Sequence, residues 1–149
     1  MADSADSVSA FIGTFYQSMD VKGRMTFPAK LRECFGERFI ITRGTGECLS
    51  VYTKEAFAVL VDKIRRLPMS PAKETYQRAL VSNATEVEPD KQGRILIPGN
   101  LRNLAKLDKE VVVTGVIDRC EIWDQQKWDS FNDNIDMGEL LVSLEGQDI

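Results

Sequence analysis

The stretch Asp20-Val21-Lys22-Gly23-Arg24-Met25-Thr26-Phe27-Pro28-Ala29-Lys30-Leu31-Arg32 returns later in the chain as Asp90-Lys91-Gln92-Gly93-Arg94-Ile95-Leu96-Ile97-Pro98-Gly99-Asn100-Leu101-Arg102. Six of the thirteen aligned pairs are identical, and two more pairs, Met25/Ile95 and Phe27/Ile97, keep their apolar character. Further matches follow downstream, where Cys48, Val51-Tyr52 and Phe57 correspond to Cys120, Ile122-Trp123 and Trp128. An internal repeat of this length predicts two copies of one structural module.

Each copy predicts a β-hairpin that leads into a short helix. The extended runs 13–19 and 84–88 enter the motif Asp-x-x-Gly-Arg, in which Asp can bond nearby backbone amides and Gly can adopt a positive φ. The residues after the motif alternate in polarity, as a half-buried strand does. Pro28 and Pro98 suit the first position of a helix. Two more strands are expected in each copy, at 38–43 with 48–52 and at 110–115 with 119–123.

Helices are expected to follow each module. Thr53, Ser70 and Asp124 are the predicted N-caps of these helices, because their side chains can accept a hydrogen bond from a free backbone N–H. One module alone would expose too much apolar surface, so the two copies are expected to bury their faces against each other. The predicted divisions are a disordered lead-in at 1–10, a first module at 13–56, connecting helices at 57–83, a second module at 84–127, and a C-terminal helix and tail at 128–149.

The composition excludes several classes of function. The chain has 149 residues, a formal net charge of −4 and no histidine, so it holds no Ser/His/Asp triad and no histidine metal ligand. Neither a catalytic nor a metal site is expected, nor a cofactor or a small-molecule substrate. The scattered cysteines Cys34, Cys48 and Cys120 lack any CxxC spacing and are interpreted as small buried hydrophobic residues. Without an apolar run long enough to span a bilayer or a cationic signal peptide, a cytoplasmic protein is predicted.

The charge is divided unequally along the chain. Residues 11–80 carry 12 basic and 7 acidic side chains, whereas residues 81–149 carry 7 basic and 14 acidic ones. The whole-chain value of −4 therefore hides a basic first half that can face phosphate, while the acidic half favours solubility.

These motifs resemble those of the MraZ family, bacterial transcriptional regulators built from tandem AbrB-like modules. The resemblance rests on Phe11-x-Gly13, on the doubled Asp-x-x-Gly-Arg and Pro-x-x-Leu-Arg motifs, and on Glu121-Ile122-Trp123. It implies an α+β, β-rich fold, in which two swapped-hairpin βαββ modules form a pseudo-twofold barrel with flanking helices. It also implies a ring-shaped homo-oligomer in the nucleoid that binds short promoter direct repeats in double-stranded DNA and represses its own cell-division and cell-wall operon.

The candidate DNA contacts are basic residues at or near the two repeated turns. Arg24 at a hairpin tip can bond a guanine edge in the major groove, while Lys22 acts as a point charge on phosphate. The structural alternative is that Arg24 pairs with Asp20 only to brace the turn. Arg32 and Arg102 are expected to pair with a nearby acid or to face solvent. The predicted DNA-binding residues are Lys22, Arg24, Lys30 and Arg94, and the predicted turn residues are Asp20, Gly23, Asp90 and Gly93.

A second class of function also fits the sequence. An oligomeric scaffold without specific DNA recognition would use the same basic tips to bind acidic proteins. Dependence of affinity on salt separates the two hypotheses, because each neutralised phosphate releases counterions from duplex DNA.

Overall fold

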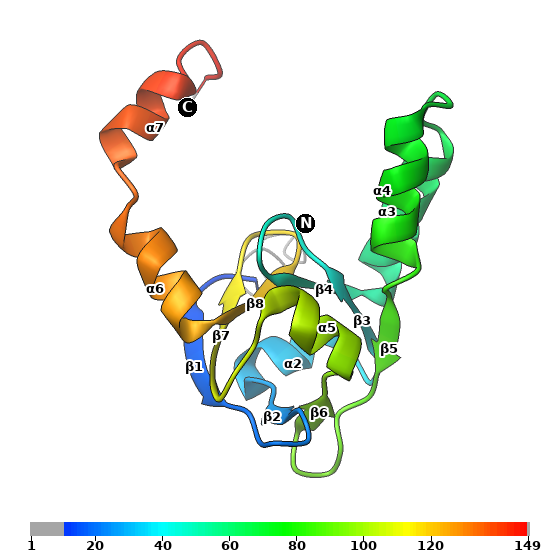
Figure 1. Ribbon diagram of the computed structural model, residues 1–149, viewed down its shortest axis with the longest axis vertical. Coiled ribbons are helices and arrows are strands. Elements are labelled where there is room, and N and C mark those ends of the chain that lie inside the picture. Colours follow the sequence, from blue (N-terminus) through cyan, green and yellow to red (C-terminus); the bar gives the residue numbers. More distant parts are fainter. Residues whose placement is uncertain (1–10, 149) are drawn as a thin grey trace.

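The computed structural model of the protein describes residues 11–148 and shows the same order of elements twice (Figure 1). Each copy runs strand, strand, helix, strand, strand, which confirms the repeat predicted from the sequence. The elements of the first copy are β1 (Thr14–Ser18), β2 (Arg24–Thr26), α2 (Ala29–Phe35), β3 (Phe39–Arg43) and β4 (Leu49–Thr53). Those of the second copy are β5 (Thr85–Val87), β6 (Arg94–Leu96), α5 (Gly99–Ala105), β7 (Glu110–Gly115) and β8 (Cys120–Asp124). The expected lead-in at 1–10 lies outside the described residues.

Strands of one copy pair with strands of the other. The larger sheet has the order β1-β7-β8-β4-β3-β5, and a second sheet consists of β2 and β6. The hairpins β3–β4 and β7–β8 form as predicted. The predicted local hairpin of β1 with β2 is wrong: a single bridge, Met19 to Met25, joins them, while β1 pairs with β7 along its whole length. Burial decides this pairing, because β2 buries Met25 opposite Ile95 of β6 at the centre of the shared core.

The hydrophobic core is built from both copies. Phe27 and Phe39 are fully buried with ring centroids 5.0 Å apart, and Ile97, Leu101 and Ile122 of the second copy belong to the same cluster. Burial of each such side chain contributes about 1.5–3 kcal/mol. The expectation that the two copies bury their faces against each other is therefore confirmed.

The short helices of the two copies begin and end in similar ways. Pro28 and Pro98 occupy the N-cap positions of α2 and α5, so each helix begins one residue later than predicted. Gly36 ends α2 with φ 75°, a conformation that glycine adopts without steric cost. The buried face of α2 consists of Leu31 and Phe35, which lie one turn apart.

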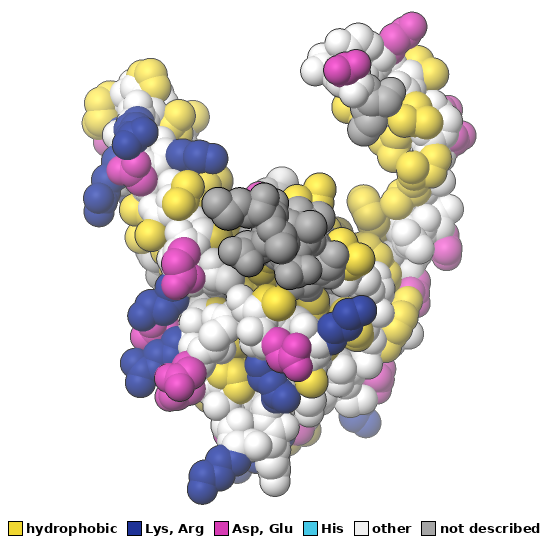
Figure 2. All heavy atoms as spheres, turned by 180° about the vertical axis from the view of Figure 1, so that it is seen from behind, with side chains coloured by type: hydrophobic (Ala, Val, Ile, Leu, Met, Phe, Trp, Pro, Cys, Tyr) yellow, Lys and Arg dark blue, Asp and Glu magenta, His cyan; other side chains and the backbone are white. Residues whose placement is uncertain are grey.

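Two helical arms project from the sheet, at the end of the molecule opposite the β2–β6 ribbon (Figure 1). The first arm consists of α3 (Lys54–Arg65) and α4 (Pro71–Val81), and the second of α6 (Gln125–Asp133) and α7 (Met137–Ser143). Figure 2 shows hydrophobic side chains on the surfaces of both arms. The exposed apolar side chains include Val59, Leu67, Met69, Tyr76 and Val81 on the first arm and Phe131, Met137, Leu140, Leu141 and Val142 on the second.

Two of the three predicted helix caps form. The hydroxyl oxygen of Thr53 accepts the N–H of Ala56 at 2.9 Å, and that of Ser70 accepts the N–H of Lys73 at 3.0 Å. Asp124 occupies the N-cap position of α6, but its carboxylate accepts the N–H of Asp108 at 3.2 Å and makes no cap bond. The predicted cap at Asp124 is thus wrong, because the carboxylate binds the backbone N–H of Asp108 and not an N–H of the helix.

The cysteine prediction holds for two of the three side chains. Cys48 and Cys120 are buried, and burial raises the pKa of each thiol to about 12. Cys34 is exposed on α2, so the expectation of a buried residue is wrong there. Within residues 11–148, no helix combines the length and the hydropathy needed to cross a membrane.

Candidate nucleic-acid interface

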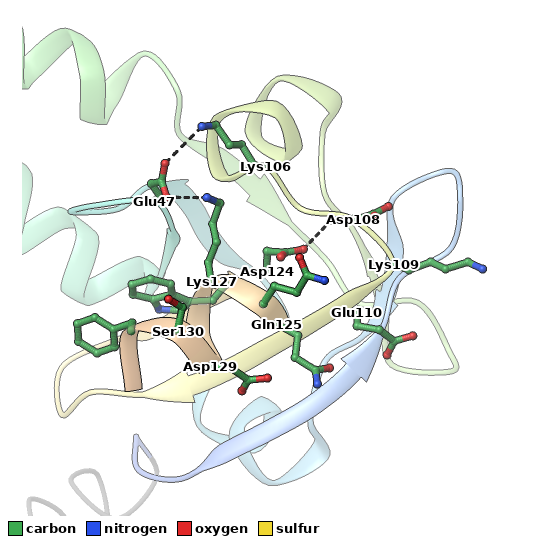
Figure 3. Close-up of a pocket in the computed structure, with 13 residues that line it drawn as sticks. Glu47, Lys106, Asp108, Lys109, Glu110, Asp124, Gln125, Lys127, Asp129 and Ser130 are labelled. Carbon is green, nitrogen blue, oxygen red and sulfur yellow. Dashed lines mark hydrogen bonds and ion pairs between the residues drawn. The ribbon is translucent and has the colours of Figure 1, made fainter. Parts of the chain in front are cut away.

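A hollow of about 850 Å³ lies beside α6 and is lined by charged side chains, three of which pair with one another (Figure 3). Glu47 accepts hydrogen bonds from Lys127 at 2.7 Å and from Lys106 at 3.4 Å, which ties the β3–β4 loop to α6 and α5. The bond from Lys127, followed by that from Lys106, lowers the pKa of Glu47. Among the described residues, no group of Cys, Asp and Glu side chains is placed to hold a metal ion. Among the described residues this hollow therefore presents no metal centre, and two of its cations, Lys106 and Lys127, are already paired with Glu47.

The two Asp-x-x-Gly-Arg turns are built in the same way. In the first turn, one oxygen of Asp20 accepts the backbone N–H groups of Lys22 and Arg24, each at 2.9 Å, and the other accepts Arg24 Nε at 2.8 Å. The backbone N–H of Arg24 is the largest cause of the lowered pKa of Asp20, followed among the favourable contacts by the guanidinium. Asp90 makes the equivalent bonds to Gln92 and Arg94 in the second turn. In both turns the aspartate thus bonds nearby backbone N–H groups, as the motif predicts.

The glycine of each turn is held by the other copy. Gly23 and Gly93 have φ values of 92° and 80°, as the motif requires. The N–H of Ile97 donates to the carbonyl oxygen of Gly23, and the N–H of Phe27 donates to that of Gly93, both at 2.9 Å. A Cβ at Gly23 would lie only 2.7 Å from the carbonyl oxygen of Ile97. The glycines thus provide both a positive φ and a close approach between the two copies.

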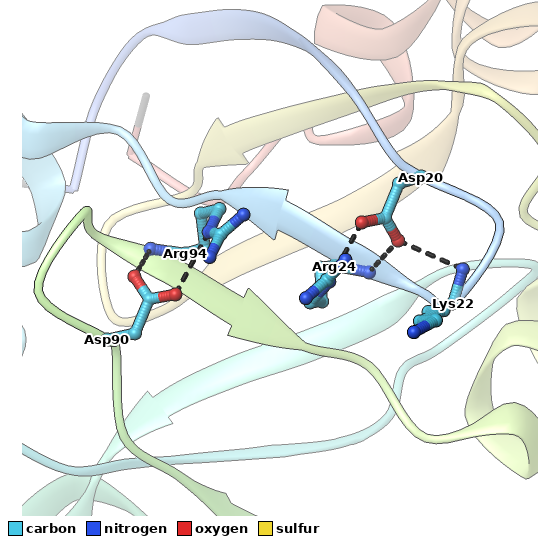
Figure 4. Close-up of polar contacts among 5 residues, drawn as sticks. All are labelled: Asp20, Lys22, Arg24, Asp90 and Arg94. Atoms are coloured by element: carbon cyan, nitrogen blue, oxygen red, sulfur yellow. Dashed lines mark hydrogen bonds and ion pairs between the residues drawn. The ribbon is translucent and has the colours of Figure 1, made fainter.

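Both turn arginines lie on the outward face of one two-stranded ribbon (Figure 4). In the β2–β6 register Arg24 is opposite Leu96 and Thr26 is opposite Arg94, while Met25 and Ile95 point into the core. Diagonal neighbours of this kind have Cα atoms about 7–8 Å apart. Sequence reasoning treated the turns as two separate tips, and the long-range pairing that joins them left no local signal to find.

Arg24 braces its turn and still presents a free guanidinium edge. Its Nε pairs with Asp20, while its two terminal nitrogens make no hydrogen bond or ion pair with other described residues. The side chain is 41% exposed, and that of Arg94, held by Asp90 in the same manner, is 37% exposed. The brace therefore fixes the direction of each guanidinium and leaves its outer edge available to a ligand.

The predicted lysines are exposed near the first turn. Lys22 lies within the turn, and its ammonium group has no partner among the described residues. Lys30 lies in the first turn of α2, directly after the ribbon, and is likewise exposed. Both side chains are thus accessible as point charges.

Arg32 and Arg102 depart from their expected roles. Neither forms an ion pair within residues 11–148, and both are half-buried. Arg102 Nε donates to the carbonyl oxygen of Ile97 at 3.0 Å, and its guanidinium packs against Gly23 of the other copy. Arg32 packs against Gly93 in the same manner. The expectation of an acidic partner or a solvated side chain is wrong, because each arginine crosses to the turn of the other copy.

Aromatic residues named in the repeat pack between each last strand and the following helix. Tyr52 and Phe57 have ring centroids 5.9 Å apart, and Trp123 and Trp128 are 5.6 Å apart. Trp123 also donates from Nε1 to the carboxylate of Glu121, which is 8% exposed. These rings therefore support the arms and do not lie on the ribbon.

The family model described as "MraZ protein, putative antitoxin-like" matches the chain at residues 10–79 and again at 80–139. The chain belongs to the MraZ family. Each of the two matched segments contains one copy of the turn motif, in agreement with the internal repeat of the sequence.

Curated relatives carry the name "Transcriptional regulator MraZ". One from Desulforamulus reducens is 49% identical over 123 residues, which cover 82% of this chain and 87% of the relative. Another from Alkaliphilus metalliredigens is 45% identical over 138 residues, or 91% of this chain and 96% of the relative. A third from Acetivibrio thermocellus is 44% identical over 134 residues, or 89% of this chain and 94% of the relative. The MraZ similarity thus extends from the turns into the arms.

Proposed function

We propose that the protein is a sequence-specific DNA-binding transcriptional regulator that binds short direct repeats in the promoter of its own cell-division and cell-wall operon and represses that operon. The names of its relatives support a role in transcription regulation. The observation that carries DNA binding is the outward face of the β2–β6 ribbon, on which two braced arginines present free guanidinium edges. The protein acts in the cytoplasm at the nucleoid, without a cofactor or small-molecule substrate.

A two-stranded ribbon of this kind fits the DNA major groove, which is about 12 Å wide. The free edge of Arg24 has the geometry to donate two hydrogen bonds to O6 and N7 of a guanine. Lys22 and Lys30 contact backbone phosphates, where a flexible ammonium group is sufficient. Arg94 reads a base in the same groove, since it shares the outward face with Arg24.

The exchanged pairing of β1 with β7 and of β2 with β6 supports the swapped-hairpin arrangement that the MraZ resemblance implies. In this arrangement one chain contains both halves of a DNA-reading unit. The ribbon and the arms lie at opposite ends of the molecule, so assembly through the arms leaves the ribbon free (Figure 1).

The two arms support assembly of several copies into a ring. Both expose apolar side chains, which rarely gather in large patches on monomeric proteins. Their charges are opposite: residues 54–81 carry six basic and three acidic side chains, whereas residues 125–143 carry one basic and four acidic ones. Contact between unlike surfaces of successive copies is a heterologous interface, which closes into a ring when the rotation permits. A ring then places several ribbons on repeated DNA sites and raises the effective concentration of each.

The test is a binding titration of the Arg24→Ala variant against a fragment of its own promoter and against random duplex DNA. Loss of a base contact should weaken promoter binding by about 1–3 kcal/mol while Asp20 still holds the turn through backbone N–H groups. Lys106→Ala is the matched control, because it removes one positive charge that is already paired with Glu47, away from the ribbon. It should change binding to both duplexes equally.

Two outcomes would contradict the proposal. Promoter binding of full strength by a folded Arg24→Ala variant would remove Arg24 from base recognition. Binding of the unmodified protein to its promoter no tighter than to random duplex would favour the oligomeric protein-binding scaffold over a specific regulator.

A further inference from the structure

Each turn of the ribbon is a composite of both copies. A Cβ placed on Gly23 would lie 2.7 Å from Arg102 Nε and 2.9 Å from its Cζ, so the guanidinium of the second copy covers the turn of the first. The guanidinium of Arg32 covers Gly93 in the same way, at a position where a Cβ would overlap it. The last arginine of each Pro-x-x-Leu-Arg motif therefore belongs, in space, to the turn of the other copy.

Hydrogen bonds hold Arg102 in this position. Its Nε donates to the carbonyl oxygen of Ile97 at 3.0 Å, and the N–H of the same Ile97 donates to the carbonyl oxygen of Gly23 at 2.9 Å. One residue thus links the guanidinium to the turn that it covers. A planar group held through Nε loses little further conformational entropy when its terminal nitrogens bind a ligand.

The charge of this guanidinium is not used within the described part of the chain. Several other basic side chains have an acidic partner, as Lys54 does in Glu86 at 3.0 Å and Arg66 does in Asp62 at 2.8 Å. Neither Arg102 nor Arg32 has such an acidic partner among residues 11–148. The acidic groups lining the hollow beside Arg102 are Asp20, whose two oxygens are taken by the turn and Arg24, and Asp108.

Basic groups of the second copy lie beside the first turn. The hollow beside Arg102 is lined by Val21 and Asp20 of the first copy and by Arg102 and Lys109 of the second. Lys109 forms no ion pair with any described residue. A ligand in this hollow therefore meets two cations of the second copy beside the turn of the first.

We propose that Arg102 and Arg32 each bind a DNA backbone phosphate beside the turn of the other copy. At each turn, one copy then supplies the arginine that contacts a base, and the other copy supplies the arginine that contacts a phosphate. This inference rests on the proposed function and adds two phosphate-binding residues to it. A guanidinium offers two parallel N–H donors that match two phosphate oxygens. Loss of either contact would lower the affinity for all duplex sequences alike, because phosphate contacts carry no sequence information.

The experiment measures how the affinity of the full chain for its promoter fragment and for random duplex depends on salt. Each lost phosphate contact should reduce the slope of log affinity against log salt by about 0.9. Arg102→Gln and Arg32→Gln should each show this reduced slope, and each should weaken binding to the promoter fragment and to random duplex by the same factor. Lys106→Gln is the matched control, since it removes the same charge from the same helix region as Arg102, at the end bonded to Glu47. Its slope should remain that of the unmodified protein.

A reduced slope in folded Arg102→Gln, with an unchanged slope in Lys106→Gln, supports the phosphate contact. An unchanged slope in folded Arg102→Gln overturns it, and so does an equal reduction in both variants, which would reflect net charge alone. If Arg102→Gln fails to fold, the equivalent variant Arg32→Gln decides: a slope lower by about 0.9 supports the phosphate contact, and an unchanged slope overturns it. Absence of salt-dependent duplex binding by the unmodified protein would instead contradict the proposed function itself.

Discussion

The close approach at Gly23 predicts an unusually costly glycine-to-alanine substitution. Any L residue at φ 92° is strained, at a cost on the order of 1–3 kcal/mol. The added methyl carbon would also lie 2.7 Å from the carbonyl oxygen of Ile97, a backbone atom bonded into the neighbouring copy. Relief of such a contact by shifting packed structure typically costs about 1–3 kcal/mol more. We therefore expect Gly23→Ala to lower the free energy of unfolding by about 2–6 kcal/mol.

Gly46→Ala is the control that separates the cost of the close contact at Gly23 from the cost of backbone strain. Gly46 has almost the same φ, 91°, but a Cβ there meets nothing within 4 Å, so only the cost of strain applies. Urea denaturation followed by circular dichroism measures the free energy of unfolding of both variants. The protein concentration is kept the same throughout, because the stability of an oligomer depends on it. Gly23→Ala should be the less stable by about 1–3 kcal/mol. Equal losses in the two variants would refute the close approach between the copies.

Two further predictions concern titratable groups. A thiol alkylating reagent at pH 8 should label the exposed Cys34 in the native protein, and should reach Cys48 and Cys120, whose thiol pKa values are about 12, only after denaturation; three labels per native chain would contradict their burial. The lowered pKa of Asp20 means that its contribution to stability is present well above pH 3.8 and is lost as the pH falls through the lower pKa of the folded state. The stability difference between the unmodified protein and Asp20→Asn should therefore narrow in acid, and a difference that stays constant through this range would contradict the assigned contacts.

Local structure was largely predictable from the sequence. The positions of the strands, the caps at Thr53 and Ser70, and the positive φ of Gly23 all depend on bonds formed within a few residues. The prediction at Asp124 failed because a distant donor, the N–H of Asp108, competes for the carboxylate. The prediction at Cys34 failed because the buried face of α2 is occupied by Leu31 and Phe35.

The candidate site was predictable in its residues and not in its assembly. The repeated motif identified Arg24 and Arg94, but the two strands that carry them are far apart in the sequence. An alternating strand pattern specifies which side chains are buried without specifying the partner strand. The ribbon therefore required the tertiary structure, as did the crossing of Arg102 to Gly23.

By itself, the sequence determined that the protein has two copies of one module, each with an aspartate-braced turn followed by an arginine. These features depend on short-range hydrogen bonds and on the backbone freedom of glycine, which any chain with this motif possesses. Only the tertiary structure decided that β1 pairs with β7, that β2 pairs with β6, and that each turn is covered by an arginine of the other copy. The physical reason is that a single copy cannot bury Met25, Phe27 and their counterparts alone, so the strands pair where the shared core is complete.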